Sequence, residues 1–173
     1  MTFSSISASY SEESLDLFRL DSIDLKLLDA LQTDAALTNH ALAERVHVSP
    51  ATCLRRVKRL VDAGIVERRV AILSPERLGH GLTAIVEVTL DRQSAEALAA
   101  FEARAVAEVA VRQCHRVSPG PDFVLTIQLA DMAAYHALVQ ALFTADANVR
   151  NVKAFFSVHR AKFETRIALP KPA

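Results

Sequence analysis

The sequence contains few of the residues that build disulfide, metal or phosphate sites. Among 173 residues there are two cysteines, four glycines and no tryptophan. Cys53 and Cys114 lie far apart with no CxxC spacing, which argues against a disulfide framework or a thiolate metal site. Four glycines form no loop that could cradle a phosphate. We therefore expect no metal, no cofactor and no catalytic constellation.

Long apolar runs are also missing. No run approaches the roughly 18 residues that a membrane helix needs, and the start MTFSSISASYSEE lacks the basic end and apolar core of a signal peptide. Apolar residues still make up 51% of the chain, so it should fold. We expect a cytoplasmic protein without membrane contact, in which residues 1–19 form a flexible serine-rich tail.

Charge is balanced overall but not along the chain. Twenty Lys and Arg match twenty Asp and Glu. Between Arg45 and Arg69, however, seven basic residues stand against Asp62 and Glu67, and residues 49–61 contain four basic residues and no acid. A solvated helix face normally mixes signs, because opposite charges four residues apart stabilise it. A row of cations without acids instead favours an anionic partner, and DNA phosphate is the obvious one.

Residues 20–73 predict a helix-turn-helix domain with a wing. Asp21, Thr38 and Ser49 are each placed to cap the start of a helix. Pro50 fits the first position of the third helix, and Gly64 fits its end. The short turn before the third helix brings it steeply against the second, as in helix-turn-helix proteins. The run IVERRVAIL that follows predicts a strand of the wing.

The third helix has an apolar face and a basic face, at about 100° per residue. Cys53, Val57 and Leu60, flanked by Leu54 and Val61, should face the core. The opposite face predicts a recognition helix in the major groove of double-stranded DNA, with two wing arginines on the DNA backbone. The predicted DNA-binding residues are Ser49, Pro50, Ala51, Thr52, Arg55, Arg56, Lys58, Arg59, Arg68 and Arg69.

The stretch LDSIDLKLLDALQTDAALTNHALAERVHVSPATCLRRVKRLVDAGIVE resembles the DNA-binding half of the Lrp/AsnC transcription regulators. VSPATCLRRVKRL followed by AGIV is the specific part of this likeness, which extends over residues 20–170. His47 departs from it, since the family usually has glycine in this turn. Such a position commonly needs a positive φ, so we expect a local cost of about 1–2 kcal/mol and an unchanged fold.

Residues 82–170 predict a ferredoxin-like βαββαβ domain after a linker over 74–81 that is rich in Pro and Gly. The fold class is therefore α+β. Two helices cover only one face of a four-stranded sheet, so we expect a homodimer through the other face. A dimer would place two recognition helices on a pseudo-palindromic operator. The expected strands are 82–90, 111–118, 122–130 and 148–163, and the expected helices are 92–107 and 131–143.

The resemblance also implies an effector site and larger assemblies. In the family, amino acids bind near a turn of the form Gly-x-x-Asp after the second strand, and dimers often assemble further, here to a tetramer or an octamer. Pro119 has no N–H to offer a ligand carboxylate, and Val152 and Ala154 stand where many relatives have Thr. Effector binding therefore competes with a simpler role in which the aspartate only closes the hairpin turn. The matching residues are Ser118, Gly120 and Asp122.

Together these patterns predict a sequence-specific DNA-binding regulator of the Lrp/AsnC type that responds to an amino acid or a related metabolite. The alternative is an enzyme resembling the sirohaem decarboxylases, which share this two-domain layout. In that case His115, Arg116 and His159 would line a cleft of the sheet domain. An enzyme has no need for unpaired cations on the third helix, so this feature favours the regulator.

Overall fold

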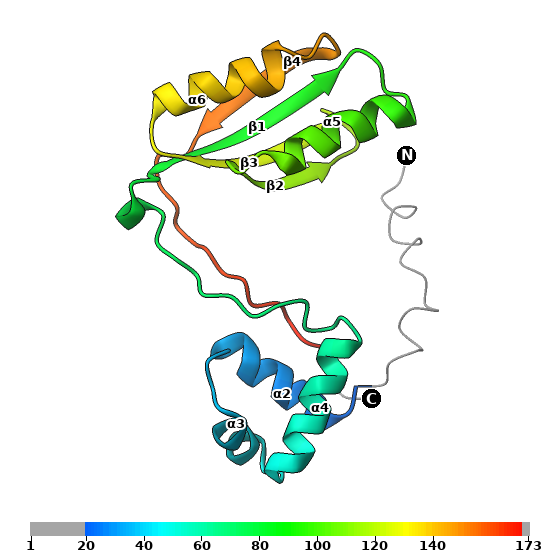
Figure 1. Ribbon diagram of the computed structural model, residues 1–173, viewed down its shortest axis with the longest axis vertical. Helices are drawn as coiled ribbons and strands as arrows, with labels where there is room; N and C mark the ends of the chain where they lie inside the picture. Colours follow the sequence, from blue (N-terminus) through cyan, green and yellow to red (C-terminus); the bar gives the residue numbers. More distant parts are fainter. Residues whose placement is uncertain (1–19, 171–173) are drawn as a thin grey trace. The chain divides into compact units, whose positions relative to one another are not determined.

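The computed structural model describes residues 20–170, which form two compact units (Figure 1). The helical unit runs to Ala71 and takes in the chain again from Phe163, whereas the sheet unit is Ile72–Lys162. The serine-rich tail expected over residues 1–19 lies outside the described residues. The predicted boundary placed residues 163–170 with the sheet, but they lie in the helical unit.

Each helix of the helical unit begins at the predicted cap. The side chains of Asp21, Thr38 and Ser49 accept hydrogen bonds from backbone N–H groups of the first turn, which would otherwise have no partner. Asp24 completes a capping box with Asp21. The helices are α2 (Ser22–Thr33), α3 (Asn39–Val46) and α4 (Pro50–Asp62).

Two helices end in the same way, at a residue with left-handed backbone. After α3, His47 has φ 59° and ψ 50°, and after α4, Gly64 has φ 71°. In both ends the next residue donates its N–H to a carbonyl five residues back, at 3.0 Å for Val48 to Ala43 and for Ile65 to Leu60. The positive φ predicted for His47 is confirmed.

The core of the helical unit is built from one apolar stripe of each helix. Leu27 of α2 and Cys53 and Leu60 of α4 are fully buried, and Leu169 from the returning segment packs against them. The buried face predicted for α4 is therefore confirmed at its centre. Its flanks differ, because Leu54 is 61% exposed and Val61 44% exposed.

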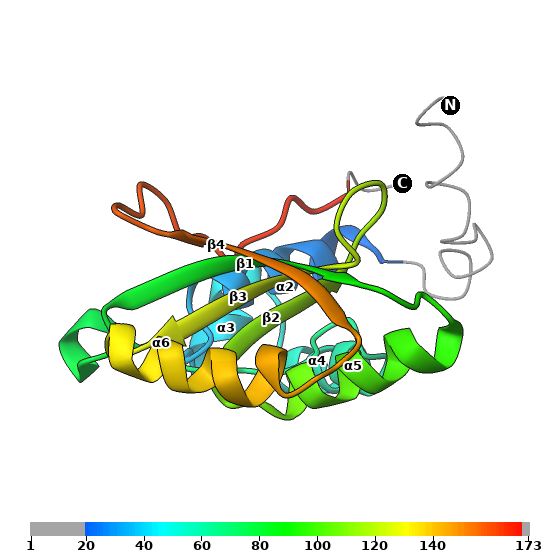
Figure 2. The same cartoon turned by 90° about the horizontal axis from the view of Figure 1, so that it is seen from above.

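The sheet unit is a four-stranded antiparallel sheet with the strand order β2-β3-β1-β4. Both α5 and α6 lie on the same face of it (Figure 2). This arrangement is the predicted ferredoxin-like βαββαβ fold. The elements are β1 (Leu82–Leu90), α5 (Ala95–Ala107), β2 (Val111–Arg116), β3 (Phe123–Leu129), α6 (Met132–Leu138), the π-helical turn η3 (Val139–Thr144) and β4 (Val149–Phe156).

Alternation along the strands separates the two faces of the sheet. In β1 every second residue from Ala84 to Leu90 is buried under the helices, and Phe123, Leu125 and Ile127 of β3 are buried beside them. The rings of Phe101 on α5 and Phe123 have centroids 4.8 Å apart in the middle of this core.

The strand predictions outside the sheet are not met in the described residues. Residues 65–73, expected as a wing strand, form no strand. The last strand ends at Phe156 and not near Phe163. The linker expected over 74–81 falls within the sheet unit and contains one short 3₁₀ turn, η2 (Glu76–Leu78).

Candidate nucleic-acid interface

The start of α4 is fixed by side chains that come immediately before it and from α3. The Ser49 hydroxyl accepts the N–H of Thr52 at 3.2 Å and donates to the Thr52 hydroxyl at 2.9 Å. The Asn39 amide at the start of α3 donates to the Pro50 carbonyl at 2.8 Å. Ser49 and Thr52 are thus engaged in the cap, and Pro50 needs no donor partner at the first position.

The solvent-facing side of α4 carries two of the predicted cations. Ala51, Arg55 and Lys58 are exposed, and neither Arg55 nor Lys58 forms a hydrogen bond or an ion pair within residues 20–170. Leu54 lies at the edge of this surface. We call these four residues the outer face of α4. It combines positive charge with apolar groups, which can contact DNA phosphates, base edges and thymine methyl groups.

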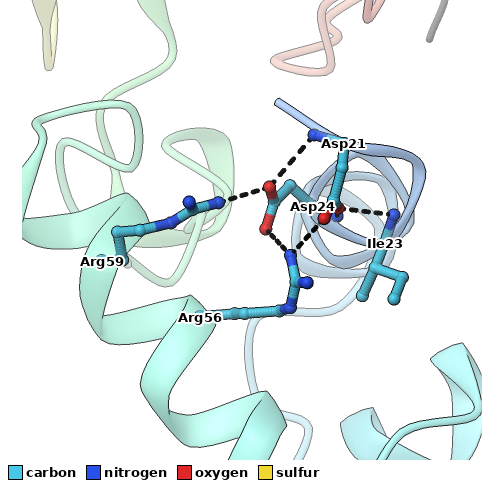
Figure 3. Close-up of polar contacts among 5 residues, drawn as sticks. All are labelled: Asp21, Ile23, Asp24, Arg56 and Arg59. Atoms are coloured by element: carbon cyan, nitrogen blue, oxygen red, sulfur yellow. Dashed lines mark hydrogen bonds and ion pairs between the residues drawn. The ribbon is translucent and has the colours of Figure 1, made fainter. Parts of the chain in front are cut away.

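The other two cations of α4 are not unpaired, which corrects the interpretation of all four as one free basic face. Arg56 donates to Asp21 at 2.7 Å and to Asp24 at 2.9 Å, and its side chain is only 18% exposed. Arg59 forms an ion pair with Asp24 (Figure 3). Asp21 caps α2 and Asp24 lies in its first turn, so the sequence of α4 alone does not reveal these partners.

The electrostatics of this cluster follow from its geometry. The backbone N–H of Asp24, and then the Arg56 guanidinium, hold the pKa of the Asp21 carboxyl below its ordinary value. The two carboxylates in turn raise the pKa of Arg56. Asp24 is fully buried, and burying a carboxylate is tolerable only because two guanidinium groups and the Asp21 N–H surround it.

The predicted wing arginines are exposed but lie outside any regular element. Arg68 and Arg69 follow α4 in a segment that forms no helix or strand. The described residues therefore bring Arg55 and Lys58 onto one helix face, and they leave the wing arginines on a separate segment of the same unit.

The predicted effector turn joins β2 and β3 in the sheet unit. Its aspartate is tied to the end of β1: one carboxylate oxygen of Asp122 accepts the N–H of Leu90 at 2.7 Å, and its own N–H donates to the Val88 carbonyl at 2.9 Å. Ser118 and Gly120 are exposed, and Gly120 has φ 127°, a backbone that other residues rarely adopt. The bond between Ser118 and Pro119 is cis.

Similarity to known proteins extends over both units. Residues 20–67 match the family described as winged helix-turn-helix DNA-binding, and residues 83–167 match the Lrp/AsnC ligand binding domain. The chain belongs to the Lrp/AsnC family of transcription regulators. The resemblance that the sequence carries is thereby confirmed, and this Lrp/AsnC protein is a DNA-binding transcription regulator with a ligand-binding domain.

Individual relatives of this Lrp/AsnC regulator cover nearly its whole described length. The leucine-responsive regulatory protein of Rhizobium meliloti is 38% identical over 143 residues, which are 83% of this chain and 92% of that protein. The transcriptional activator DecR of Escherichia coli is 34% identical over 87% of this chain and 99% of its own. A transcriptional regulator of Neisseria meningitidis, solved in complex with L-Met, has a TM-score of 0.81 at 35% identity and covers 86% of this chain and 96% of its own.

The residues that the alternative enzyme hypothesis placed in one cleft, His115, Arg116 and His159, do not lie together in this Lrp/AsnC regulator. His115 and Arg116 are neighbours on β2 and point to opposite faces of the sheet. Arg116 pairs with Glu102 of α5 at 2.6 Å. His159 follows β4, which is the opposite edge of the sheet from β2. The named relatives are transcription regulators.

Two further properties concern the residues that the structure describes. Within 20–170, no helix combines the length and apolar character needed to cross a membrane. The same residues contain no group of three or more His, Cys, Asp or Glu side chains that could hold a metal ion.

Sequence reasoning missed the role of Asp24. Its position three residues after Asp21 is the signal of a capping box, which the structure confirms. That signal explains why an acid stands there, but it does not reveal that the same carboxylate reaches across to α4.

Proposed function

We propose that this regulator binds the major groove of double-stranded DNA through the outer face of α4. Arg55 and Lys58 would supply the positive charge, Ala51 and Leu54 the apolar contacts, and the capped start of the helix would lie nearest the bases. Arg68 and Arg69 would contact the DNA backbone. Arg56 is withdrawn from the proposed contact set, because two carboxylates of α2 already hold its guanidinium.

One observation carries this proposal. The acids of α2 engage one flank of α4 through Arg56 and Arg59, while Arg55 and Lys58 on the next flank have no acidic partner within the described residues. Exposed cations on a helix that follows a helix-turn-helix turn are an electrostatic footprint for nucleic acid.

The test is DNA binding by wild type and two matched arginine variants. A duplex is selected from a random-sequence pool with the wild-type protein, and fluorescence anisotropy compares it with a scrambled duplex at several salt concentrations. We expect the selected duplex to bind tighter by about a thousandfold. Arg55→Ala should lose about 5- to 150-fold on the selected duplex if it contacts a base. Arg112→Ala, an exposed arginine of β2, is the control and should change nothing. Equal losses in both variants would contradict the proposal.

The uncovered face of the sheet is the proposed dimer interface. It presents Ile85 and Phe155, each 44% exposed, with Val124 between polar side chains. Lys153 lies 4.8 Å above the Phe155 ring. Pairing two such faces would bury these apolar groups and place two copies of α4 on a pseudo-palindromic operator. Light scattering should give a dimer or a larger assembly such as a tetramer or octamer, and a monomer at micromolar concentration would refute this interface.

An amino acid is the proposed effector. It would bind this cytoplasmic regulator at the turn between β2 and β3 and thereby change how the regulator binds DNA. The relative solved with L-Met supports this class of ligand. Asp122 could pair with the ammonium group through the carboxylate oxygen that Leu90 does not occupy, beside Ser118 and Gly120. Ligand binding would act by its differential affinity for two assembly states.

Isothermal titration with the twenty amino acids tests the effector, and Asp122→Asn is the informative variant. Asparagine keeps an oxygen for the Leu90 N–H but removes the negative charge, so the turn should survive while ammonium binding is lost. If no amino acid binds the wild type, Asp122 only closes the turn. Equal binding by both proteins would move the ligand elsewhere.

A further inference from the structure

Asp24 is the single charged residue that is fully buried in the part of the chain that the structure describes. It lies in the first turn of α2, and all its partners converge on it (Figure 3). Its Oδ1 accepts from Arg56 at 2.9 Å, and its Oδ2 accepts from Arg59 and from the backbone N–H of Asp21 at 3.1 Å. Two of the partners are side chains of α4, one turn apart.

This cluster restrains a motion that the apolar core restrains only weakly. Cys53, Val57 and Leu60 bury a stripe of α4, but apolar contacts have no preferred direction, so they tolerate a small roll of the helix about its axis. Charge-assisted hydrogen bonds are directional and short. Two of them, from Arg56 and Arg59 to one carboxylate, therefore fix the rotation of α4 against α2.

The same rotation decides where the outer face of α4 points. Arg55 and Lys58 each stand one residue before a tethered arginine, about 100° around the helix. A roll that released Arg56 and Arg59 would swing both outer cations by the same angle. Arg56 cannot easily adopt another arrangement, because its side chain is only 18% exposed and is held by two carboxylates.

We propose that Asp24 is a positioning residue for DNA recognition, which holds the recognition helix at the rotation where Arg55 and Lys58 face the groove. The inference rests on the proposed DNA-binding function and adds a residue that touches no DNA. It separates two roles of the cations on α4: the pair that orients the helix and the pair that contacts DNA.

The decisive variant is Asp24→Asn, which keeps the shape of the side chain and removes its charge. Asp29→Asn is the matched control, since Asp29 lies on the same helix and pairs with Arg166, away from α4. The selected and scrambled duplexes are titrated with each protein at several salt concentrations. The folded fraction is measured in parallel by circular dichroism.

For Asp24→Asn we expect affinity for the selected duplex to fall tenfold or more while affinity for the scrambled duplex holds or rises. Arg59, 44% exposed, loses its ion pair with Asp24 and can turn to phosphate, so the slope of log affinity against log salt should steepen by about one. Asp29→Asn should leave the specificity ratio unchanged. Asp24→Glu, which keeps the charge, should recover part of the ratio.

A purely structural role would give a different result and would overturn the inference. In that case both affinities fall together with the folded fraction, and neither the ratio nor the salt slope changes. If Asp24→Asn does not fold, Arg56→Lys keeps the buried charge but loses the two-acid contact, and an unchanged ratio in it would also overturn the inference. A wild-type protein that fails to discriminate the two duplexes would instead refute the proposed function itself.

Discussion

The left-handed residue after α3 offers a direct test of the backbone energetics. His47 has φ 59° and ψ 50°, and its exposed side chain forms no hydrogen bond or ion pair within residues 20–170 that would offset the strain. Gly64 stands at the equivalent position after α4, with φ 71°. The variants His47→Gly and Gly64→His exchange the two residue types. One removes the free-energy cost of a non-glycine residue with left-handed backbone, and the other introduces it.

The magnitude follows from two opposing contributions. A non-glycine residue in this conformation costs about 1–2 kcal/mol, whereas glycine makes the unfolded chain more flexible by about 0.4–1 kcal/mol. His47→Gly should therefore stabilise the helical unit by about 0.5–1 kcal/mol. Gly64→His should destabilise it by a similar amount, because a Cβ added at Gly64 meets no atom within 4 Å and only the backbone contributes.

The assay is the rate at which a thiol reagent labels Cys53 in a Cys114→Ala background. Cys53 is fully buried and burial raises the pKa of its thiol, so labelling requires opening of the helical unit. His47→Gly should slow labelling about 2- to 5-fold, and Gly64→His should speed it by a similar factor. Labelling that is unchanged in both variants, or that moves in the same direction, would refute the strain argument.

Three further predictions concern stability. The pKa of Asp21 is lowered in the folded protein. The stability that its carboxylate contributes is therefore present above its ordinary pKa and is lost as pH falls through the lower folded value. The difference in melting temperature between wild type and Asp21→Asn should shrink on acidification below about pH 4. Phe101→Ala should destabilise the sheet unit by about 3–5 kcal/mol in urea unfolding, because the ring is fully buried against Phe123. Leu169→Ala should lower the opening free energy reported by Cys53 by about 1 kcal/mol and leave the sheet unit unchanged, since this half-buried side chain packs on the helical core.

The elements predicted best are those whose signals are local in sequence. Asp21, Thr38 and Ser49 were identified as caps because each precedes an amphipathic repeat, and each accepts the expected N–H. The strand over Leu82–Leu90 matches its prediction at both ends, because this run is rich in β-branched residues and contains no glycine or proline. Helix caps and strand alternation depend on neighbours within a few residues, so a single sequence contains them.

The predictions that differ depend on partners far along the chain. The wing strand predicted over 65–73 has the right residue types, but a strand also needs a neighbour with which it forms hydrogen bonds, and no strand pairing is present there in the described chain. The return of residues 163–170 to the helical unit rests on Leu169 and on Ile167, whose N–H donates to Gln32 at 2.7 Å across 135 residues of sequence. The residues around each contact partner contain no signal in the sequence that identifies the distant partner.

The charge of α4 shows how such a distant contact changes a functional conclusion, and the salt dependence of DNA binding can measure it. Seven basic residues lie between Arg45 and Arg69, but Arg56 and Arg59 are engaged by acids of α2, 32 to 35 residues earlier. Each phosphate that a cation neutralises adds about 0.9 to the slope of log affinity against log salt. Lys58→Gln should therefore reduce the slope by about 0.9 per protomer, whereas Arg59→Gln, its immediate neighbour, should leave the slope unchanged. If both variants reduce the slope equally, Arg59 leaves Asp24 when DNA binds, and the pairing seen here belongs only to the DNA-free protein.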